Sequence, residues 1–474
     1  MKDMNAKQAF NLGRSYHEKG NLAQAEKIYE AVLQVDPHHA EATHNLGMIF
    51  AARGLREEAI EYVKRSLELD GSNPNFHNNM GELYRIAGQI EHAQFHLSAA
   101  CELKPGFSEA FSNLGIIHME KGEIDDAKYC FAEALASNPK NVNALINTGN
   151  LFRKTGNFND AIECYEAVLE LSPDNPTALI CAAISHNEIM DYNNAAKYYS
   201  RLVANRPELQ KEKLALAEIT LRNKDFRKGL KLYEARFNVF NILKGDRETL
   251  WRGTGLEGKT LYVYYEDTVI CGLGDTILFC RYLHELEKFN PGKVVLQLQP
   301  ELAELFEGQM PDFVELTTED VQEFDVHSPL LSLPMILNAR AKTIPLANGY
   351  LKAEPANRET DKIRIGYAFN ENIDQNALSL FEADDRVEIF PLEGTMKEKA
   401  DKAASADLVI TSDNEIVHLA GAMGIKTCLL LEENHHWRWF RAKTEKTSEW
   451  YSSVTFYIKE KGADWLNVIS SIKV

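Results

Sequence analysis

Asn45-Leu46-Gly47 is one copy of the tripeptide that decides the fold of the N-terminal half. Asn-Leu-Gly also stands at residues 11–13 and 113–115, and degraded copies stand at 79–81 and 147–149. Neighbouring copies are always 34 residues apart. A fixed period of this length is typical of a solenoid built from helical hairpins.

The positions around the tripeptide keep the same spacing. A glycine follows the apolar residue of each first helix, where a large side chain would push two helices apart, and a second glycine is expected to cap that helix. Those two sets are Gly13, Gly47, Gly81, Gly115 and Gly149, and Gly20, Gly54, Gly88, Gly122 and Gly156. The large contacts expected in the second helix are Tyr29, Val63, Leu97, Phe131, Tyr165 and Tyr199. The pattern resembles the tetratricopeptide repeat, with six repeats over 6–209, a divergent seventh at 210–243, and a superhelix over 6–243.

One asparagine recurs on the first helix of five successive repeats, as Asn11, Asn45, Asn79, Asn113 and Asn147. Stacking of the repeats predicts a ladder of carboxamides, each of which has a donor and an acceptor for a peptide backbone. The protein O-GlcNAc transferases resemble this, because an asparagine ladder in their repeats holds the acceptor polypeptide. The alternative interpretation is that these side chains only face water.

Composition limits the classes of function. The net charge of −18 argues against a general nucleic-acid binder. Residues 210–243 reverse this trend, with eight basic and four acidic side chains. Three interpretations of this basic segment are open: an intramolecular seam, a docking patch or a solvated helix face. The sequence has no signal-like start and no apolar run long enough for a span, and its seven cysteines form no Cys-x-x-Cys pair. We therefore expect a cytoplasmic protein without a metal site or a disulfide framework.

The periodicity changes after residue 243, where short β-rich runs alternate with helical stretches and predict an α/β architecture. The expected strands are Lys259–Glu266, Lys293–Gln299, Lys362–Ala368, Leu408–Ser412, Lys426–Leu431 and Val454–Lys459. A stretch with Gly, Pro and charged residues at 348–361 reads as a linker. It would divide this half into a first lobe at 244–347 and a second lobe at 362–474.

Two turns carry the candidate chemistry. Gly272-Leu273-Gly274-Asp275-Thr276 lies between the first strand and its helix, where backbone N–H groups can approach an anion. Asp275 is either a helix cap or a general base. Ser412-Asp413-Asn414 follows a buried strand, and His418 lies one helical turn further on. This second turn is either a phosphate site or a capped helix with a packed histidine.

Several motifs together are similar to those of bacterial tetratricopeptide-repeat proteins with a carboxy-terminal glycosyltransferase domain. They are Leu250-Trp251-Arg252-Gly253, Gly258-Lys259-Thr260-Leu261, the 272–276 turn, Phe279-Cys280-Arg281-Tyr282-Leu283, 324–334, 413–424, Trp437-Arg438-Trp439 and Trp450-Tyr451. The segment Gly229–Phe237 looks like the last repeat of this family. The resemblance implies a GT-B fold of two Rossmann-type lobes, related to the heptosyltransferases of family nine.

The resemblance also implies roles for individual residues. Asp275 maps onto the catalytic base of the acceptor lobe, whose turn also contributes Gly272, Gly274 and Thr276 to the donor site. On the nucleotide-sugar lobe, Ser412, Asp413, Asn414 and His418 map onto the turn that binds the donor diphosphate. Backbone amides and helix dipoles then neutralise the leaving group without a metal or another cofactor.

The sequence departs from the family at three places. Asn414 and Glu415 replace Thr and Gly of the donor turn, which puts a carboxylate where a diphosphate is expected. The first turn has extra residues at 267–271. The stretch Phe369–Leu392 is short, so we expect a second lobe without the additional strand and the phosphate-binding cation of the family. Arg438 is the candidate replacement for that cation.

These observations favour a glycosyltransferase that moves a sugar, with inversion, from a nucleotide donor to a protein acceptor held by the repeats. The alternative is a protein-interaction scaffold whose transferase domain has lost its chemistry. A lipopolysaccharide heptosyltransferase would fit the second half but would leave the repeats without a purpose.

Overall fold

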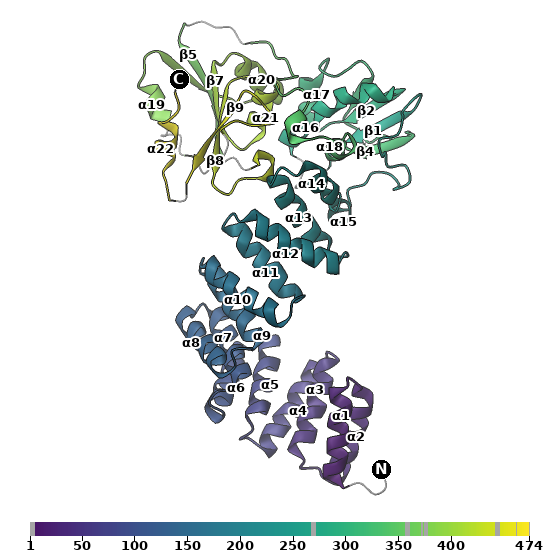
Figure 1. Cartoon of the computed structure of the whole chain (residues 1–474), viewed down its shortest axis with the longest axis vertical. Coiled ribbons are helices and arrows are strands. Elements are labelled where there is room, and N and C mark those ends of the chain that lie inside the picture. The colour runs from purple at the N-terminus through teal and green to yellow at the C-terminus, as the bar shows by residue number, and fades with distance from the viewer. Residues whose placement is uncertain are drawn as a thin grey trace. The chain divides into compact units, whose positions relative to one another are not determined.

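The structure is a computed structural model that describes residues 5–266, 272–355, 361–370, 373, 378–440, 446–460 and 462–473. Figure 1 shows the whole chain. It divides into two compact units, Met1–Ile189 and Met190–Val474. No helix in the described part of the chain is both long enough and apolar enough to cross a bilayer.

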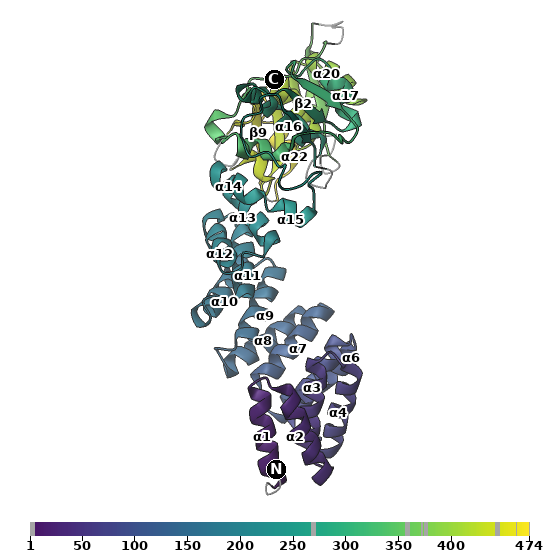
Figure 2. The same ribbon diagram turned by 90° about the vertical axis from the view of Figure 1, so that its right-hand side faces the viewer.

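The first unit consists of helices of 13 or 14 residues that pair in chain order (Figures 1 and 2). They are α1 (Ala6–Glu18), α2 (Leu22–Val35), α3 (Ala40–Ala52), α4 (Arg56–Leu69), α5 (Pro74–Ile86), α6 (Ile90–Leu103), α7 (Ser108–Lys121), α8 (Ile124–Ser137), α9 (Val142–Lys154), α10 (Phe158–Leu171) and α11 (Pro176–Glu188). Each odd-numbered helix is the first helix of a repeat, so the predicted helical superhelix is confirmed.

The glycines of the repeat act as the sequence predicts. A Cβ atom on them would approach the predicted partners of the second helix closely: Gly13 to 2.8 Å from Tyr29, Gly47 to 3.0 Å from Val63, Gly81 to 2.5 Å from Leu97, Gly115 to 2.5 Å from Phe131 and Gly149 to 2.6 Å from Tyr165. The second set of glycines ends the first helices, with φ between 74° at Gly20 and 80° at Gly122. A side chain is therefore excluded by contact at the first set and by backbone conformation at the second.

The second unit begins with helices that continue the repeat and then changes to a parallel sheet. The helices are α12 (Tyr192–Asn205), α13 (Gln210–Arg222), α14 (Phe226–Tyr233) and α15 (Arg236–Phe240). The sheet has the order β3-β2-β1-β4, with β1 (Thr260–Tyr264), β2 (Lys293–Gln297), β3 (Val314–Thr317) and β4 (Val326–Pro329). The helical segments around it are α16 (Leu273–Cys280), η1 (Arg281–Phe289), α17 (Pro300–Phe306), η2 (Leu330–Ser332), α18 (Leu333–Ile336) and η3 (Ala341–Thr343).

A second parallel sheet follows, in the order β6-β5-β7-β8-β9. Its strands are β5 (Ile363–Ala368), β6 (Val387–Pro391), β7 (Leu408–Ser412), β8 (Thr427–Glu432) and β9 (Val454–Lys459). Its helices are α19 (Ser379–Glu382), α20 (Met396–Ala404), α21 (Glu415–Ala422), η5 (Trp437–Trp439) and α22 (Trp465–Ile469). The prediction of an α/β region is confirmed as two parallel sheets.

The sequence prediction missed three strands. All six expected strands are present, but β3, β4 and β6 were not expected. The strands β3 and β4 have only four residues each, which gives too short a pattern to detect. Strand β6 lies inside the stretch Phe369–Leu392, so the expectation that this stretch adds no strand is wrong. It is an edge strand with half-exposed side chains, and it therefore lacks the apolar run of a central strand.

The basic segment 210–243 is an intramolecular seam. Buried side chains of α13 and α14 belong to the same hydrophobic core as both sheets. The ring of Phe226 lies 5.3 Å from that of Phe440 and 5.7 Å from that of Trp450, and Tyr233 packs edge-on against Trp437. The apolar face of this last helical pair therefore binds the α/β region, and its basic side chains lie around that contact.

A buried ion pair fixes the same junction. Arg236 and Glu266 are both fully buried, and two guanidinium nitrogens donate to the two carboxylate oxygens at 2.9 and 2.7 Å. Arg236 also donates to Ser332 Oγ at 2.8 Å and pairs with Glu234 at 2.7 Å. One guanidinium thus joins the end of the repeats to the end of strand β1.

Candidate functional site

The two turns predicted from the sequence meet in the second unit. Helix α16 begins beyond the carboxyl end of β1, and helix α21 begins directly beyond β7. The two helices pack against each other. A Cβ atom at Gly274 would lie 2.5 Å from Cδ2 of His418, so glycine is required for this approach. Two helix N-termini, each with unpaired N–H groups, therefore lie near one point.

A cavity of about 310 Å³ lies at this point. It is lined by Gly272, Leu273, Gly274, Asp275, Asp413, Asn414, Glu415, His418, His436 and Arg438. Seven of these were predicted as site residues from the sequence: Gly272, Gly274, Asp275, Asp413, Asn414, His418 and Arg438. Thr276 and Ser412 are not among them. The sequence prediction of one site built from both lobes thus corresponds to one cavity.

Asp275 is the most perturbed acid of the cavity. Its side chain is 8% exposed, and it forms an ion pair with Arg438. Burial raises the pKa of Asp275 to about 6, and the Arg438 charge opposes that shift. The carboxylate also accepts a hydrogen bond from the backbone N–H of Gly272 at 3.2 Å. Both predicted roles, helix cap and general base, are compatible with this position.

His436 was not found by sequence reasoning. Its Nδ1 lies 2.7 Å from Nη1 of Arg438, and burial followed by the Arg438 charge lowers the pKa of His436 to about 2. The imidazole is therefore neutral and accepts from the guanidinium. Arg438 is held between this imidazole and the Asp275 carboxylate. The only sequence signal was the position of His436 beside the Trp437-Arg438-Trp439 motif.

His418 is a packed residue that also lines the cavity. Its ring stacks on Trp439 at 5.2 Å, and its Nδ1 lies 3.2 Å from the Tyr451 hydroxyl. Burial, together with the charges of Arg438 and Arg281, holds the pKa of His418 well below its usual value. The ring is neutral at physiological pH and can donate one hydrogen bond.

The carboxylate of Glu415 has a partner. Lys399 on α20 donates to Glu415 Oε1 at 2.9 Å. This ion pair offsets the negative charge that the sequence places at the donor turn. Lys399 is a cation near that turn that the motif comparison did not detect, because it comes from a different helix.

The remaining turn residues organise the backbone. Asn414 Oδ1 accepts from the backbone N–H of Ile416 at 2.9 Å and so caps α21. Ser412 Oγ accepts from the backbone N–H of Asn370 at 2.9 Å. Thr276 Oγ1 donates to Gln299 Oε1 at 2.8 Å within the first lobe. Residues 267–271, the predicted insertion in the first turn, lie outside the described residues.

A second cavity of about 230 Å³ adjoins the first on the second sheet. The two cavities share Asp413 and His436. Burial raises the pKa of Asp413. The second cavity also has Trp465, Ile373 and the carboxylate of Glu432 at the end of β8. This cavity was not predicted from the sequence, because its described lining residues come from four separate segments: 370–373, 412–413, 430–436 and Trp465.

The asparagines of the first unit are hydrogen-bonded to one another's repeats. Three of them donate through Nδ2 to the residue that precedes the ladder position in the previous repeat: Asn79 to His44 at 3.0 Å, Asn113 to Asn78 at 3.0 Å and Asn147 to Ser112 at 3.1 Å. Asn45 donates to Tyr29 at 3.3 Å, and Asn11 is exposed. The predicted ladder therefore links consecutive repeats.

Part of the ladder is still available for a peptide. The Oδ1 atoms of Asn113 and Asn147 have no hydrogen-bond partner in the described part of the chain. The other two interior members are more committed, since Asn45 Oδ1 contacts His44 and Asn79 Oδ1 accepts from Asn78. A peptide would therefore find unengaged acceptor oxygens at Asn113 and Asn147.

One group of metal-ligand side chains exists in the described residues of the first unit. His118, Glu123 and Asp126 bring their ligand atoms within 4.8 Å of one another. Glu123 is already bound by His118 at 2.6 Å and by Lys121 at 2.7 Å. The group is therefore an exposed ion-pair network, separate from the cavity described above.

Comparison with known proteins identifies the N-terminal region. Residues 5–72 match one tetratricopeptide-repeat family model, and residues 112–176 and 146–209 match another. No curated protein matches the chain. The N-terminal region therefore consists of tetratricopeptide repeats, which are protein-interaction modules, and these family models do not extend beyond residue 209.

Solved structures that are similar to the chain are repeat proteins. Pseudomonas aeruginosa PilF is 24% identical over 45% of this chain and 97% of its own, with a TM-score of 0.41. PilW, a type IV pilus biogenesis factor, is 19% identical over 44% of this chain and 98% of its own, with a TM-score of 0.42. A thermophilic repeat protein of Thermus thermophilus is 21% identical over 38% of this chain and 98% of its own, with a TM-score of 0.34.

Proposed function

We propose that the protein is a glycosyltransferase of the GT-B class that moves a sugar from a nucleotide donor to a protein acceptor held by the repeats. The observation that carries the proposal is the cavity in which Asp275 and Arg438 lie at the N-termini of α16 and α21. A buried carboxylate with a raised pKa beside a cation and two helix N-termini provides a base and an anion site together.

The donor would bind across the two cavities. Its diphosphate lies at the N-terminus of α21, where unpaired N–H groups, Arg438 and the neutral ring of His418 donate hydrogen bonds. Its nucleoside occupies the smaller cavity, where Trp465 provides an apolar wall and Glu432 an acceptor for ribose hydroxyls. The proposal needs no metal, because the charge of the leaving group is met by these donors.

Arg438 links donor binding to activation of the base. In the free protein its guanidinium pairs with Asp275, which weakens that carboxylate as a base. A diphosphate competes for the same guanidinium, so donor binding releases Asp275 to accept a proton. In the free protein the pKa of Asp275 is about 6, and loss of the Arg438 pair raises it further, toward the neutral value that favours general-base catalysis.

The reaction is a single displacement. The acceptor hydroxyl oxygen attacks the anomeric carbon from the side opposite the diphosphate, and the proton of the hydroxyl passes to the Asp275 carboxylate. The bond from the anomeric carbon to the diphosphate oxygen breaks, and the nucleoside diphosphate leaves with both electrons. The configuration of the sugar is therefore inverted.

We place this reaction in the cytoplasm. The six described cysteines form no disulfide with one another, and most of them are buried. Free thiols of this kind are usual in a reducing compartment.

A thermal-shift panel of nucleotide sugars tests the proposal. Ligand at 100 times its Kd stabilises the native state by about 2.7 kcal/mol, which gives a measurable rise in Tm. We expect a rise with at least one nucleotide sugar, and none with the matching free sugar. If no member of a broad panel raises Tm, the chain is the interaction scaffold described as the alternative.

A further inference from the structure

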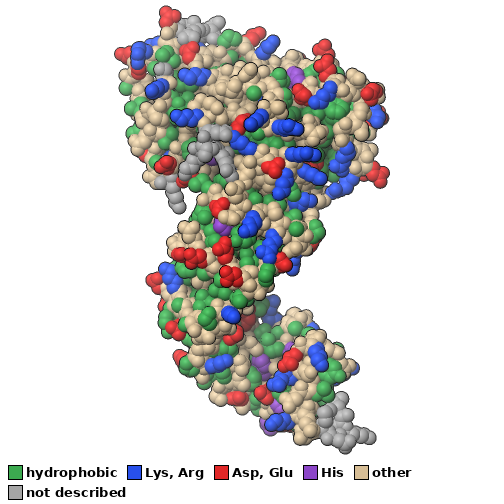
Figure 3. Space-filling view, viewed as in Figure 1, with side chains coloured by type: hydrophobic (Ala, Val, Ile, Leu, Met, Phe, Trp, Pro, Cys, Tyr) green, Lys and Arg blue, Asp and Glu red, His purple; other side chains and the backbone are tan. Residues whose placement is uncertain are grey.

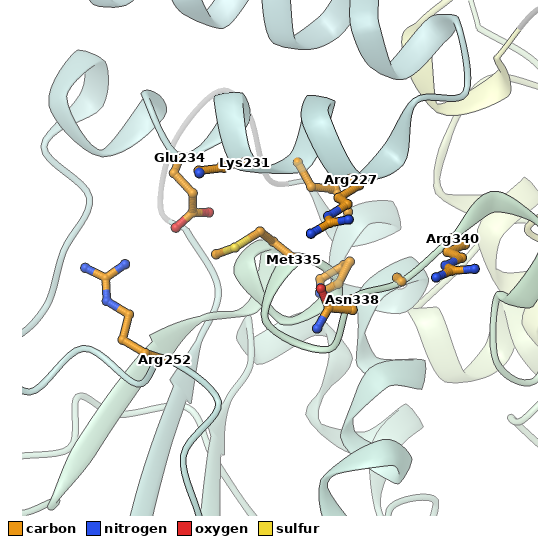
Figure 4. A pocket seen from close by; sticks show the side chains of 10 residues that line it. Arg227, Lys231, Glu234, Arg252, Met335, Asn338 and Arg340 are labelled. Atoms are coloured by element: carbon orange, nitrogen blue, oxygen red, sulfur yellow. The ribbon is translucent and has the colours of Figure 1, made fainter.

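A larger cavity lies elsewhere in the second unit. Its volume is about 790 Å³, and it lies between α14 and the segment around α18 (Figure 4). Its lining residues are Arg227, Leu230, Lys231, Glu234, Arg252, Pro334, Met335, Asn338, Ala339 and Arg340. None of them lines the proposed transfer site.

The cavity is strongly basic on a strongly acidic protein. Four cations line it, and the net charge of the chain is −18. Figure 3 shows Lys and Arg side chains gathered over α14 and α18. Among the residues that the structure describes, none of the four cations has an ion-pair or hydrogen-bond partner. All four cations are exposed, so an anion can bind them without displacing a protein partner.

The one carboxylate of the cavity does not neutralise them. Glu234 pairs with Arg236 at 2.7 Å and accepts from Ser332 Oγ at 2.9 Å. Its charge is thus offset by a buried guanidinium that is not part of the lining. Among the described lining residues, the four cations therefore outnumber the one carboxylate, and that carboxylate already has partners.

The arrangement of the cations selects an extended ligand. In Figure 4, Arg252 and Arg340 lie at opposite sides of the cavity, with Lys231, Met335 and Arg227 between them. Cations spread in this way match several separated anions better than one compact anion. Carboxylates at alternate positions of an extended peptide are spaced by about 7 Å and point to the same side.

The rest of the lining disfavours a nucleobase and fits a peptide. None of the described residues that line the cavity is aromatic, so among them a nucleobase would have nothing to stack on. Leu230, Pro334, Met335 and Ala339 provide an apolar wall for aliphatic side chains. Arginines and a carboxamide, that of Asn338, are the groups that bind carboxylates and peptide backbone.

We propose that this cavity docks an Asp- and Glu-rich segment of the acceptor polypeptide, beside its glycosylated residue in sequence. The role of this cavity in selecting the acceptor rests on the proposed transfer function. Its binding of an acidic peptide does not depend on that function. It would select acidic acceptors at the edge of the catalytic unit, and the repeats would hold another part of the same polypeptide.

The test is the fluorescence anisotropy of a labelled Glu-rich peptide with the full chain, against the same peptide with Gln in place of Glu. We expect the Glu peptide to bind at least about 10-fold more tightly, and rising salt to weaken it because the Debye length falls from about 10 Å at 0.1 M to about 3 Å at 1 M. Equal affinity for the two peptides would overturn the proposal.

Helix α14 provides matched variants. Arg227→Gln with Lys231→Gln removes two cations from the lining, and we expect at least about 10-fold weaker binding of the Glu peptide. Lys228→Gln removes an exposed cation of the same helix that does not line the cavity, and it should bind almost as wild type. Equal losses in both variants would indicate nonspecific attraction and would overturn the proposal.

Two further measurements separate the ligands and the proposals. Inorganic tripolyphosphate that displaces the peptide at lower concentration than the unlabelled peptide itself would assign the cavity to phosphate and overturn the acidic-segment assignment. The nucleotide-sugar thermal shift should be the same in wild type and in the Arg227/Lys231 variant. Its absence in wild type would remove the transfer function while leaving the peptide result intact.

Discussion

The repeats of the first unit and the helical pair α13–α14 of the second unit share one repeat pattern, but the two regions pack against different partners. In the first unit a glycine such as Gly115 lies against a large residue of its own repeat, Phe131, and asparagine Nδ2 groups join neighbouring repeats. In the second unit α13 and α14 pack their large side chains into a core that contains both sheets.

The difference shows where each part obtains its stability. Interactions in the first unit are between neighbours, so a loss there affects few other residues. At the junction of the second unit, one arginine or one aromatic ring connects the last repeat to the α/β region. The same period in sequence therefore predicts a helical pair in both places, but not what that pair supports.

The largest difference is expected between two arginine–glutamate pairs. Arg236→Met should destabilise the second unit by about 3–5 kcal/mol, because it leaves the buried Glu266 without its cation. Arg53→Met breaks the solvent-exposed pair with Glu26 in the first unit and should leave its melting unchanged. Denaturant unfolding of the two variants measures this, and equal effects would show that the junction is no more demanding than the repeats.

Asp275→Asn should shift stability in a pH-dependent way. Because burial raises the pKa of Asp275 from 3.8 to about 6, the native state binds more protons than the unfolded state between these values. Wild-type stability from this group is therefore lost as pH rises through that range. The variant should gain up to about 3 kcal/mol relative to wild type between pH 4 and pH 7.

Denaturation of both proteins across that pH range checks this, since titrations elsewhere in the chain cancel in the difference. A difference that stays constant with pH would mean that Asp275 is not held at a raised pKa. A buried carboxylate with such a raised pKa is typical of a functional site.

His418→Ala should weaken the binding of a nucleotide sugar by about 1–3 kcal/mol, the scale of a hydrogen bond to a charged group. Calorimetry measures the affinity. Tyr451→Phe is the control, because it removes the hydroxyl that faces His418 Nδ1 and does not alter the lining of the cavity. Equal affinity in wild type and His418→Ala would place the diphosphate elsewhere.

The smallest expected effect on stability is that of single substitutions in the asparagine ladder. Asn113→Ala and Asn147→Ala each remove one hydrogen bond between repeats, at about 0.5–1.5 kcal/mol, although alanine favours the helix.

If the ladder also holds a peptide, changing Asn45, Asn79, Asn113 and Asn147 together to Ala should abolish protein glycosylation. Hydrolysis of the donor by water should continue. Transfer that persists in this variant would assign the ladder to repeat stacking alone.

Much of the fold follows from the sequence because its signals are local. Gly81 and Leu97 are 16 positions apart within one repeat, and the first five repeats all have a glycine and a large side chain at this spacing. Buried strands such as Leu408–Ser412 contain an apolar run, here Leu408-Val409-Ile410. Edge strand β6 has no such run, so its existence depends on β5 beside it.

The site was predictable only where motifs lie at helix starts. Asp275 and His418 each stand at or near the first turn of a helix that follows a strand, and parallel strands bring such turns to one edge. His436 and Lys399 lie outside those turns, and tertiary packing alone sets their contacts with Arg438 and Glu415. The role of 210–243 was ambiguous for the same reason, since its charges are visible in the sequence and its partner rings are not.

The most direct test of the central claim is the rate of sugar transfer by wild type and by Asp275→Asn, with the nucleotide sugar that raises Tm most and a lysate of acceptor proteins. We expect the variant to bind the donor as wild type does and to transfer at least about 100-fold more slowly. The wild-type kcat/KM should rise with pH through about 6, as Asp275 of the free protein loses its proton. Full transfer by the variant, or a rate independent of pH in this range, would contradict the account.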